Sequence, residues 1–460
     1  MKSPLKVMFH SSIPRLFRTT LIGHLYEICQ SYPTVLISEH MDEETNIALS
    51  NKSLFPKLVT IEAVSSDSTG KPRKNLVNRF LQHSYFRKLS DNLIKKHTPD
   101  IVIVENDVSL FEMYLLRAAK RGKAVTIAIQ SSVKIPVESN KVFLTHTLAR
   151  SKFPNLLPLS IRLTLVRLQR LLGHFLVYWI LPLSNLTKPF KGPTSYITWD
   201  SVTGLRQADR YVVLSKAYYN QFLNEGVDKT KLLVLPHPLN REPRSFFKQA
   251  YPNAYIQNKS HPTNKDILTI LLPGFNSGFD RATLEPFDAT ELFTLRINKV
   301  LSLVSSILPT WTVYLKAHPL YDIASMPSSL SNLISDNVFL ADQYDPIDKY
   351  IEMSRGIIAT PPITSVLLTA RYQNPDIVLL AVDLANEFGG EFYKEFPGVE
   401  YITDIQTLTN SLVALQKHSP AKSEFLTTPE NYSLTLPTLI DQIISSINST
   451  KEKPTTFRMQ

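Results

Sequence analysis

Short apolar runs and stretches of helical spacing alternate along the first 130 residues of the chain. The apolar runs, which we interpret as buried strands, span residues 5–10, 33–38, 58–64, 100–105 and 123–130. Between them, apolar residues recur every three or four positions, as on one face of a helix, and Gly122 ends the last of these stretches. Strands that alternate with helices are typical of βαβ units, so this region is predicted to form a parallel sheet.

The same alternation returns further along the chain. It is interrupted at 131–195 and resumes with apolar runs at 208–215 and 231–238. Residues 239–265 are rich in Pro, Asn, Lys and Ser and show little periodicity, which is typical of a connection between domains. A second series of apolar runs then follows at 266–274, 311–319, 337–344, 356–362 and 376–382.

This pattern predicts an α/β fold with two Rossmann-like, doubly wound parallel-sheet lobes and a cleft between them. We expect an amino-terminal lobe at 1–240, a linker at 241–265, a carboxyl-terminal lobe at 266–448 and a polar tail at 449–460. A chain of 460 residues is too long for one ordinary core, which agrees with two lobes. Ligands of open α/β sheets bind outside the carboxyl ends of the strands, so loops of both lobes should face the cleft.

Composition indicates a globular protein of a reducing compartment. Hydrophobic residues make up 43% of the chain and charged residues 20%, which are ordinary values for a folded protein. Cys29 is the single cysteine and cannot form an internal disulfide. The first residues, "MKSPLKVMFH", lack the apolar stretch of a signal peptide. We therefore expect a cytoplasmic protein.

The net charge of +10 is concentrated in one segment, residues 139–199, which contains no Asp or Glu. Arg162, Arg167 and Arg170 fall within an arc of about 140° on a helical wheel, with Leu, Ile and Val on the other side. The uncharged run at 171–183 has 13 residues, short of the roughly 20 that span a bilayer. This pattern favours an amphipathic helical insertion that lies on an anionic membrane surface.

This basic segment has two alternative interpretations. Its arginines could be the solvated face of two helices packed in the amino-terminal lobe. Nucleic acid is a weaker candidate, because aromatic residues are not interleaved with the arginines in any known module. We therefore expect a peripheral attachment to the inner face of the membrane and no nucleic-acid partner.

The stretch "WTVYLKAHPLYD" places two side chains that can carry positive charge at the end of a predicted strand. Lys316 and His318 are two residues apart and so share one face of the strand, and Pro319 stops the strand there. An ammonium group and an imidazole that point into a cleft can hold a phosphate or a carboxylate. The alternative is a strand-end loop in which both side chains are structural.

Two more strand ends of the same lobe have residues that suit a phosphate. Small and polar residues follow the strand at 266–274 and would allow backbone N–H groups to approach a phosphate: Gly274, Asn276 and Ser277. In "ATPPITSVLLTA", Thr364 and Ser365 open an apolar helix whose first turn favours an anion. Turn formation and helix capping are the alternatives for each loop, but three such loops together predict a nucleotide-phosphate site.

Several segments carry a resemblance to a known family. "ADRYVVLSKAYYNQFLNEGVDKTKLLVLPHPL" is followed by a lobe with "KAHP" and "PPITSVLLTARYQNP". Together they resemble two-lobed GT-B glycosyltransferases, and the Lys-x-His-Pro element is similar to that of enzymes that build bacterial capsule, teichoic acid and sialic-acid polymers. The resemblance implies that His318, Thr364 and Ser365 contact the donor phosphate.

The sequence departs from these relatives in two places. Several of them carry a His-Gly after the strand at 123–130, where this chain has Gln130, Ser131 and Ser132. The helix that follows "TPPITS" also lacks the Glu that is typical of retaining GT-B enzymes. The resemblance therefore implies inverting chemistry.

The candidates for the general base are in the amino-terminal lobe, where the acceptor should bind. Glu105 and Asp107 come at the end of the strand at 100–105 and alternate so that both face one way. His10 follows the first strand, beside residues that we expect to contact the acceptor: Ser11, Ser12 and Arg15. Helix capping is the alternative for Asp107, and a satisfied loop histidine is the alternative for His10.

These observations predict a metal-independent glycosyltransferase. It would move a sugar from a CMP-, CDP- or UDP-linked donor to a surface polysaccharide or a lipid-linked glycan. No Asp-x-Asp or clustered His/Cys set suggests a metal or another cofactor, so Lys316, His318 and Arg281 would neutralise the leaving phosphate. The alternatives are a polyol-phosphate transferase with a CDP-glycerol-like donor, a non-catalytic GT-B-fold subunit at the membrane, and a nucleotide-sugar epimerase.

Overall fold

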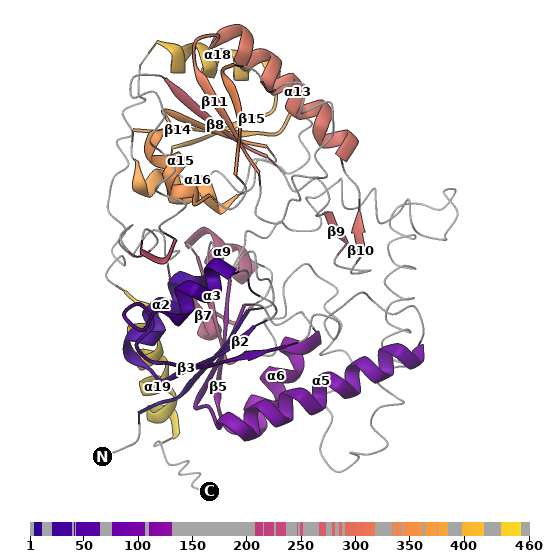
Figure 1. The fold of residues 1–460 in the computed structure, drawn as a ribbon, viewed down its shortest axis with the longest axis vertical. Helices are drawn as coiled ribbons and strands as arrows, with labels where there is room; N and C mark the ends of the chain where they lie inside the picture. Colours follow the sequence, from indigo (N-terminus) through magenta and orange to yellow (C-terminus); the bar gives the residue numbers. More distant parts are fainter. Residues whose placement is uncertain are drawn as a thin grey trace, which may run out of the picture.

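Two parallel sheets, one in each lobe, organise the computed structural model of the chain (Figure 1). The structure describes residues 4–11, 21–38, 41, 43–64, 76–105, 110–130, 208–214, 216–224, 227–235, 246, 249–251, 266–272, 278–280, 285–287, 290–317, 334, 336–342, 345–360, 364–374, 376–384, 398–417 and 434–451.

The first lobe is built on a seven-stranded sheet of order β3-β2-β1-β4-β5-β6-β7, in which all neighbours run parallel. Its strands are β1 (Val7–Ser11), β2 (Thr34–Ser38), β3 (Leu58–Ala63), β4 (Ile101–Val104), β5 (Val125–Ile129), β6 (Arg210–Val213) and β7 (Leu232–Val234). The central strands β1, β2 and β4 are buried at every position, which explains their continuous apolar runs.

Helices cover both faces of this sheet (Figure 1). On one face lie α2 (Ile22–Ser31) and α3 (Glu43–Ser50), which share a core with Val7, Phe9 and Leu36. On the other face lie α5 (Leu76–His97), α6 (Leu110–Arg121) and α9 (Lys216–Asn224), which share a core with Met8, Ile37 and Val102. Neighbouring residues of β1 therefore point into different cores.

The second lobe has a six-stranded parallel sheet of order β12-β11-β8-β13-β14-β15. Its strands are β8 (Ile267–Leu271), β11 (Thr312–Lys316), β12 (Val338–Ala341), β13 (Gly356–Ala359), β14 (Val378–Val382) and β15 (Val399–Ile402). Helices α13 (Thr290–Ile307) and α18 (Ile405–Gln416) cover one face, and α15 (Ile347–Met353) and α16 (Ser365–Gln373) the other. A separate hairpin joins β9 (Gly278–Asp280) and β10 (Glu285–Phe287).

The prediction of two doubly wound parallel-sheet lobes is confirmed. The basic segment at 139–199, its arginines Arg162, Arg167 and Arg170, and the end of the polar tail after 451 lie outside the described residues. None of the described helices combines the length and the apolar character that crossing a bilayer requires.

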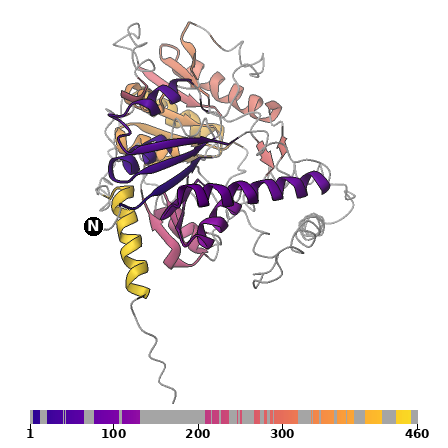
Figure 2. The same ribbon diagram turned by 60° about the horizontal axis from the view of Figure 1, so that its bottom comes forward.

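The last helix, α19 (Leu436–Lys451), packs on the first lobe, although our sequence division assigned residues 266–448 to the second. Its buried side chains join the core beneath α2, and Figures 1 and 2 both show it beside this lobe. The Tyr32 hydroxyl donates a 2.5 Å hydrogen bond to the Asp441 carboxylate. Glu27 of α2 accepts one of 3.1 Å from the Leu436 amide, which satisfies a free N–H group at the start of α19.

Part of the predicted linker also packs into the first lobe. Phe246 and Tyr251 are buried in the same core as α2. The Phe246 ring lies 4.1 Å from that of Tyr26, and the Tyr251 and Thr45 hydroxyls are 3.4 Å apart. At residues 246 and 251, the segment that joins the lobes therefore packs against the first lobe.

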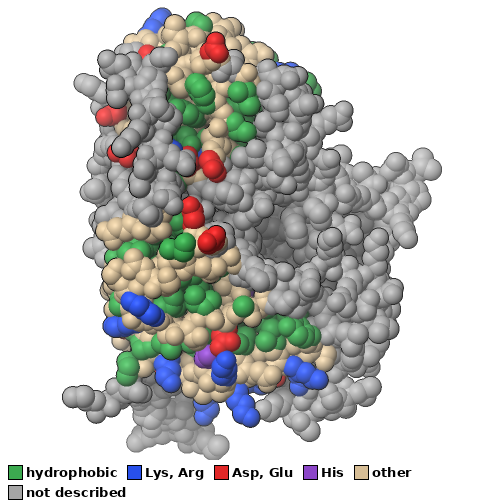
Figure 3. Space-filling model, viewed as in Figure 1, with side chains coloured by type: hydrophobic (Ala, Val, Ile, Leu, Met, Phe, Trp, Pro, Cys, Tyr) green, Lys and Arg blue, Asp and Glu red, His purple; other side chains and the backbone are tan. Residues whose placement is uncertain are grey.

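Lysines and arginines gather at the carboxyl ends of α5 and α6, at the base of the first lobe. Exposed Lys95, Lys96, Lys120 and Arg121 occupy the last turns of these helices. Figure 3 shows Lys and Arg side chains on this lower part of the molecule. Cations are favourable at helix carboxyl ends because the helix dipole is negative there.

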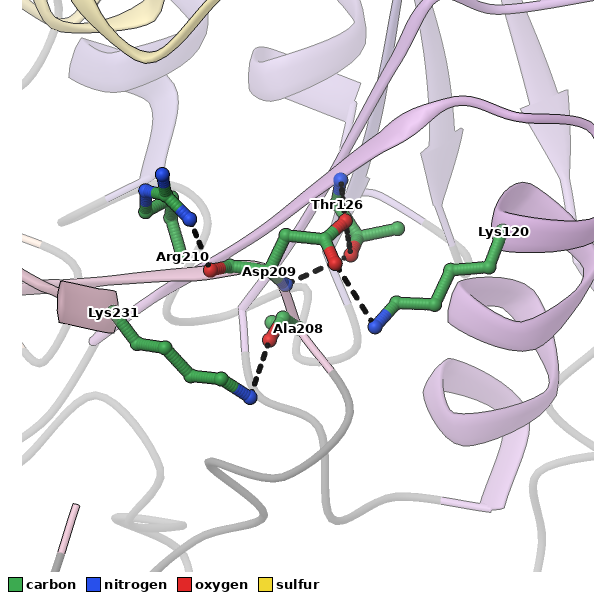
Figure 4. Close-up of polar contacts among 6 residues, drawn as sticks. All are labelled: Lys120, Thr126, Ala208, Asp209, Arg210 and Lys231. Carbon is green, nitrogen blue, oxygen red and sulfur yellow. Dashed lines mark hydrogen bonds and ion pairs between the residues drawn. The ribbon is translucent and has the colours of Figure 1, made fainter. Parts of the chain in front are cut away.

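Asp209 joins α6, β5 and β6 at the amino-terminal edge of the first sheet (Figure 4). Its carboxylate accepts hydrogen bonds from the Thr126 amide (3.0 Å) and hydroxyl (2.7 Å), and Lys120 Nζ lies 3.0 Å away. Burial raises the pKa of Asp209, but the Thr126 hydrogen bonds and the Lys120 charge outweigh burial and hold that pKa below its ordinary value.

We predict that Asp209→Asn destabilises the protein at neutral pH and much less in acid. A carboxyl group with a lowered folded-state pKa stabilises the fold above its unfolded pKa, near 3.8. That stability is lost as the pH falls through the folded-state pKa. Urea denaturation from pH 7 to pH 3 should therefore show a difference between wild type and variant that shrinks below about pH 4.

The matched control is Asp91→Asn, because Asp91 pairs with Arg121 on the same pair of helices but both side chains are about half exposed. This variant should stay within about 0.5 kcal/mol of wild type at every pH. A difference for Asp209→Asn that is constant across the pH range would contradict the assignment.

Candidate active site

Buried polar side chains stand at the carboxyl ends of four neighbouring strands in the first lobe. They are His10 and Ser11 of β1, Ser38 of β2, Glu105 directly after β4 and Gln130 directly after β5. Burying a polar group is costly unless it is hydrogen-bonded, so buried polar side chains are few in most interiors. Their concentration at the edge where α/β sheets bind ligands marks this edge as a candidate site.

His10 forms a buried pair with Glu112 of α6. The His10 Nδ1 atom lies 3.1 Å from Glu112 Oε1, and the two side chains are 2% and 0% exposed. The imidazole also meets the Phe111 ring edge to face at a centroid distance of 4.9 Å. When the Glu112 carboxylate is ionised it only accepts hydrogen bonds, and Nδ1 is then the donor of this pair.

His10 and Glu105 lie on different faces of the sheet. His10 is in register with Val104, which packs in the core beneath α6, so the His10 side chain is on the α5/α6 face. The next positions along both strands, Ser11 and Glu105, alternate to the α2/α3 face. Glu105 is therefore not placed to share a proton with the His10–Glu112 pair.

Gln130 directly follows β5, at the carboxyl edge of the first sheet. Its side chain is fully buried, and its carbonyl accepts a hydrogen bond of 3.2 Å from the Leu214 amide after β6. Gln130 thus joins the carboxyl ends of β5 and β6. We assign it a role in holding the edge of the sheet together.

In the second lobe, Lys316 ends β11 with its ammonium group turned to backbone carbonyls. Its side chain is buried, and Nζ donates to the carbonyls of Asp342 (2.9 Å) and Ala317 (3.5 Å). Nζ also lies 5.9 Å from the centre of the Tyr350 ring. Lys316 therefore ties the end of β11 to the end of β12, and a donor contact from it remains a prediction.

A partly buried polar network that includes Tyr350 lies beside this lysine. Asp345 accepts hydrogen bonds from the Tyr350 hydroxyl (2.7 Å) and from Lys349 Nζ (2.8 Å). Burial and the hydrogen bond to Asp345 together raise the pKa of Tyr350 far above its ordinary value. Tyr350 is therefore a neutral hydrogen-bond donor at every physiological pH.

Thr364 caps α16, as the sequence suggested for one of its two possible roles. Its hydroxyl accepts a hydrogen bond of 3.2 Å from the Val366 amide, and Ser365 is the first helical residue. The first turn of α16 contains no acidic residue. Thr360, at the end of β13, donates a 3.0 Å hydrogen bond to the Leu271 carbonyl at the end of β8. Thr360 thus ties the carboxyl end of β13, which precedes α16 in the chain, to that of β8.

Two buried acidic residues, one in each lobe, were not among the sequence candidates. Glu112 lies in the first turn of an amphipathic helix, and only its buried position beside His10 sets it apart from a surface glutamate. Asp383 directly follows β14, is buried, and accepts a hydrogen bond from the Tyr401 hydroxyl. Its place after the apolar run at 376–382 is the one signal that could have drawn attention to it.

The remaining sequence candidates lie outside the described residues. They are Ser12, Arg15, Asp107, Gly274, Asn276, Ser277 and His318. In the part of the chain that the structure does describe, no three His, Cys, Asp or Glu side chains are grouped as metal ligands would be.

The whole chain is similar in fold to two-lobed proteins of the GT-B-like class. UGT73P12 of Glycyrrhiza uralensis, complexed with glycyrrhetinic acid 3-O-monoglucuronide, has a TM-score of 0.56 at 9% identity, over 98% of both chains. The UDP-GlcNAc 2-epimerase of Neisseria meningitidis, bound to UDP-GlcNAc, has a TM-score of 0.54 at 13% identity, over 97% of this chain and 100% of its own.

The UDP-GlcNAc 2-epimerase of Methanocaldococcus jannaschii has a TM-score of 0.55 at 10% identity, over 96% of this chain and 100% of its own. No protein-family model matches the sequence, and no curated protein matches it. At these identities the likeness shows the fold, which is the GT-B-like arrangement of two parallel-sheet lobes.

We predict that Lys316→Met destabilises the second lobe by about 1–3 kcal/mol, because the buried ammonium group and its hydrogen bond to the Asp342 carbonyl are lost while the aliphatic stem is kept. Urea denaturation measures the loss. Lys299→Met, at an exposed position of α13, is the matched control and should stay within about 0.5 kcal/mol of wild type. Equal stabilities of the two variants would show that the Lys316 contacts contribute nothing.

Proposed function

We propose that the protein is an inverting glycosyltransferase that moves a sugar from a nucleotide-sugar donor to an acceptor hydroxyl. The observation that carries this proposal is the buried His10–Glu112 pair at the carboxyl end of β1. A histidine whose Nδ1 is held by a carboxylate is a suitable general base, and this one stands at the ligand-binding edge of a GT-B-like lobe.

The proposed reaction is a single displacement. His10 Nε2 takes the proton of the acceptor hydroxyl while the hydroxyl oxygen attacks the anomeric carbon of the donor sugar. The bond between that carbon and the phosphate oxygen breaks, and the nucleotide leaves with the bonding electrons. Glu112 stabilises the imidazolium that forms, because it accepts the Nδ1 hydrogen bond and carries the opposite charge.

We further propose that the second lobe holds the nucleotide. The start of α16 supports this proposal. It is a helix amino terminus without acidic residues, and it follows β13, whose carboxyl end is hydrogen-bonded to that of β8. The proposed donor contacts are Gly274, Asn276, Ser277, Lys316, His318, Thr364 and Ser365. With Arg281, they would neutralise the leaving phosphate without a metal ion. The epimerase of Neisseria meningitidis, which has a similar fold, is bound to UDP-GlcNAc in its structure, and this supports a nucleotide-sugar ligand here.

The acceptor is proposed to be a surface polysaccharide or a lipid-linked glycan. The acid-free segment at 139–199, with Arg162, Arg167 and Arg170, would hold the enzyme at the inner, anionic face of the membrane where such acceptors are assembled. A polyol-phosphate transferase would use the same donor lobe with a CDP-glycerol-like donor, so transfer from a CDP-linked polyol and not from a nucleotide sugar would identify it.

A thermal-shift panel with CMP, CDP, UDP, GDP and ADP tests the nucleotide site. One of them should stabilise the wild type by about 2.7 kcal/mol at about 100 times its Kd. His318→Ala should lose most of this ligand-induced shift, because its imidazole is proposed to contact the phosphate. His97→Ala, at the other end of the first lobe, makes the same substitution away from the site and should keep the shift.

A shift that survives His318→Ala would remove His318 from the phosphate site. If no nucleotide stabilises the wild type, the proposed transferase is wrong, and a non-catalytic GT-B-like subunit becomes the better account. Incubation with the matching nucleotide sugar then separates transfer from epimerisation, since an epimerase converts the donor without any acceptor.

A further inference from the structure

Ser11 is a fully buried serine whose hydroxyl has no hydrogen-bond partner among the described residues. It is the last residue of β1, directly after His10. Buried polar groups are almost always hydrogen-bonded, because an unsatisfied one forfeits its contacts with water and gains nothing in return. An exception at the ligand-binding end of a strand therefore points to a bonding partner that is supplied from outside the chain.

Ser11 stands in a row of polar side chains on one face of the sheet. On one side it is in register with Ser38 of β2. On the other side His10 is in register with Val104 of β4, so Ser11, the next residue, lies beside Glu105. Their exposed fractions are 0%, 1% and 2%. All three stand at the carboxyl ends of strands whose alternate residues pack beneath α2, so the row lies on the face opposite His10.

The chemistry of this row fits hydroxyl groups better than phosphates. The two serines can donate and accept hydrogen bonds, and the carboxylate of Glu105 accepts them from hydroxyls. A phosphate offers few hydrogen-bond donors to the Glu105 carboxyl group, so it matches this row less well than sugar hydroxyls do. A neutral sugar or polyol, which presents adjacent hydroxyls, meets these requirements.

From this geometry we infer that Ser11 binds the acceptor and that the acceptor presents neutral sugar hydroxyls there. The inference rests on the proposed transferase function and names its acceptor class. Ser11 then lies next to the proposed base on the chain but on the other face of the sheet. Binding of one acceptor hydroxyl by Ser11 would help to place a neighbouring hydroxyl at the edge of the sheet, where His10 can reach it.

The test compares Ser11→Ala with Ser90→Ala. Ser90 is a matched control because its hydroxyl is also fully buried and has no partner among the described residues, but it lies within α5, away from the strand ends. Both variants remove an unsatisfied buried hydroxyl, so both should melt at or above the wild-type temperature without ligand. Only Ser11→Ala should change ligand binding.

Binding is measured with methyl α- and β-glycosides of glucose, galactose and mannose, and with glycerol 3-phosphate, each in the presence of the stabilising nucleotide. At least one methyl glycoside should bind the wild type and Ser90→Ala equally. The Kd of that glycoside should rise about 3- to 10-fold in Ser11→Ala, the change expected for the loss of one neutral hydrogen bond. Glycerol 3-phosphate should bind none of them.

Equal glycoside affinities for Ser11→Ala and wild type would overturn the inference, and so would tighter binding of glycerol 3-phosphate than of any glycoside. A nucleotide shift without binding of any glycoside would also overturn it and would leave the proposed transferase standing. The absence of any nucleotide shift would instead count against the transferase itself.

Discussion

Parallel strand pairing is the constraint on which the rest of this structure depends. Every neighbour in the seven-stranded and six-stranded sheets runs parallel, so all carboxyl ends of a sheet meet at one edge. Residues far apart in sequence, such as His10, Glu105 and Gln130, are brought together there. The opposite edge carries a hydrogen-bonded network around Asp209 that joins helix and strands. The amino-terminal edge of the first sheet is thus held by a structural network, and the carboxyl edge is where the candidate site lies.

Two segments outside the sheets connect the lobes. The chain enters the second lobe after Phe246 and Tyr251, which are packed in the first lobe, and it returns at its end as α19 on the same core. The Glu27–Leu436 hydrogen bond joins this last helix to α2, and the Tyr32–Asp441 hydrogen bond joins it to the residue that follows α2. Because α2 follows β1 in the chain, the helix that receives α19 also belongs to the βα unit that carries His10 and Ser11.

The sequence was sufficient for the parts of the fold that local periodicity controls. Continuous apolar runs separated by helical spacing predicted both parallel sheets, and the Thr364–Ser365 pair predicted the start of α16. His10 and Glu105 were recognised because polar residues directly after an apolar run lie at a strand end. These predictions depend only on neighbours in the chain, which is why they could be made without the structure.

Contacts between distant elements could not be predicted in this way. The Glu112 side chain differs from a surface glutamate only through the packing of α6 against β1. For Lys316, the pairing of β11 with β12 brings the Asp342 carbonyl within 2.9 Å of its ammonium group, a partner that the sequence did not predict. The helical spacing at 436–451 indicates a helix but not the lobe that receives it. In each case the partner is set by tertiary packing, which no local pattern contains.

The most direct test of this account is hydrogen–deuterium exchange of the full chain with and without the nucleotide that stabilises it. The account predicts slower exchange with nucleotide in the segments at 271–278, 316–320 and 359–368, at the carboxyl edge of the second sheet. It predicts no change at 98–101 and 122–126, at the amino-terminal edge of the first. Protection confined to the amino-terminal edge, or absent from all three segments of the second lobe, would contradict the placement of a nucleotide-sugar site in this protein.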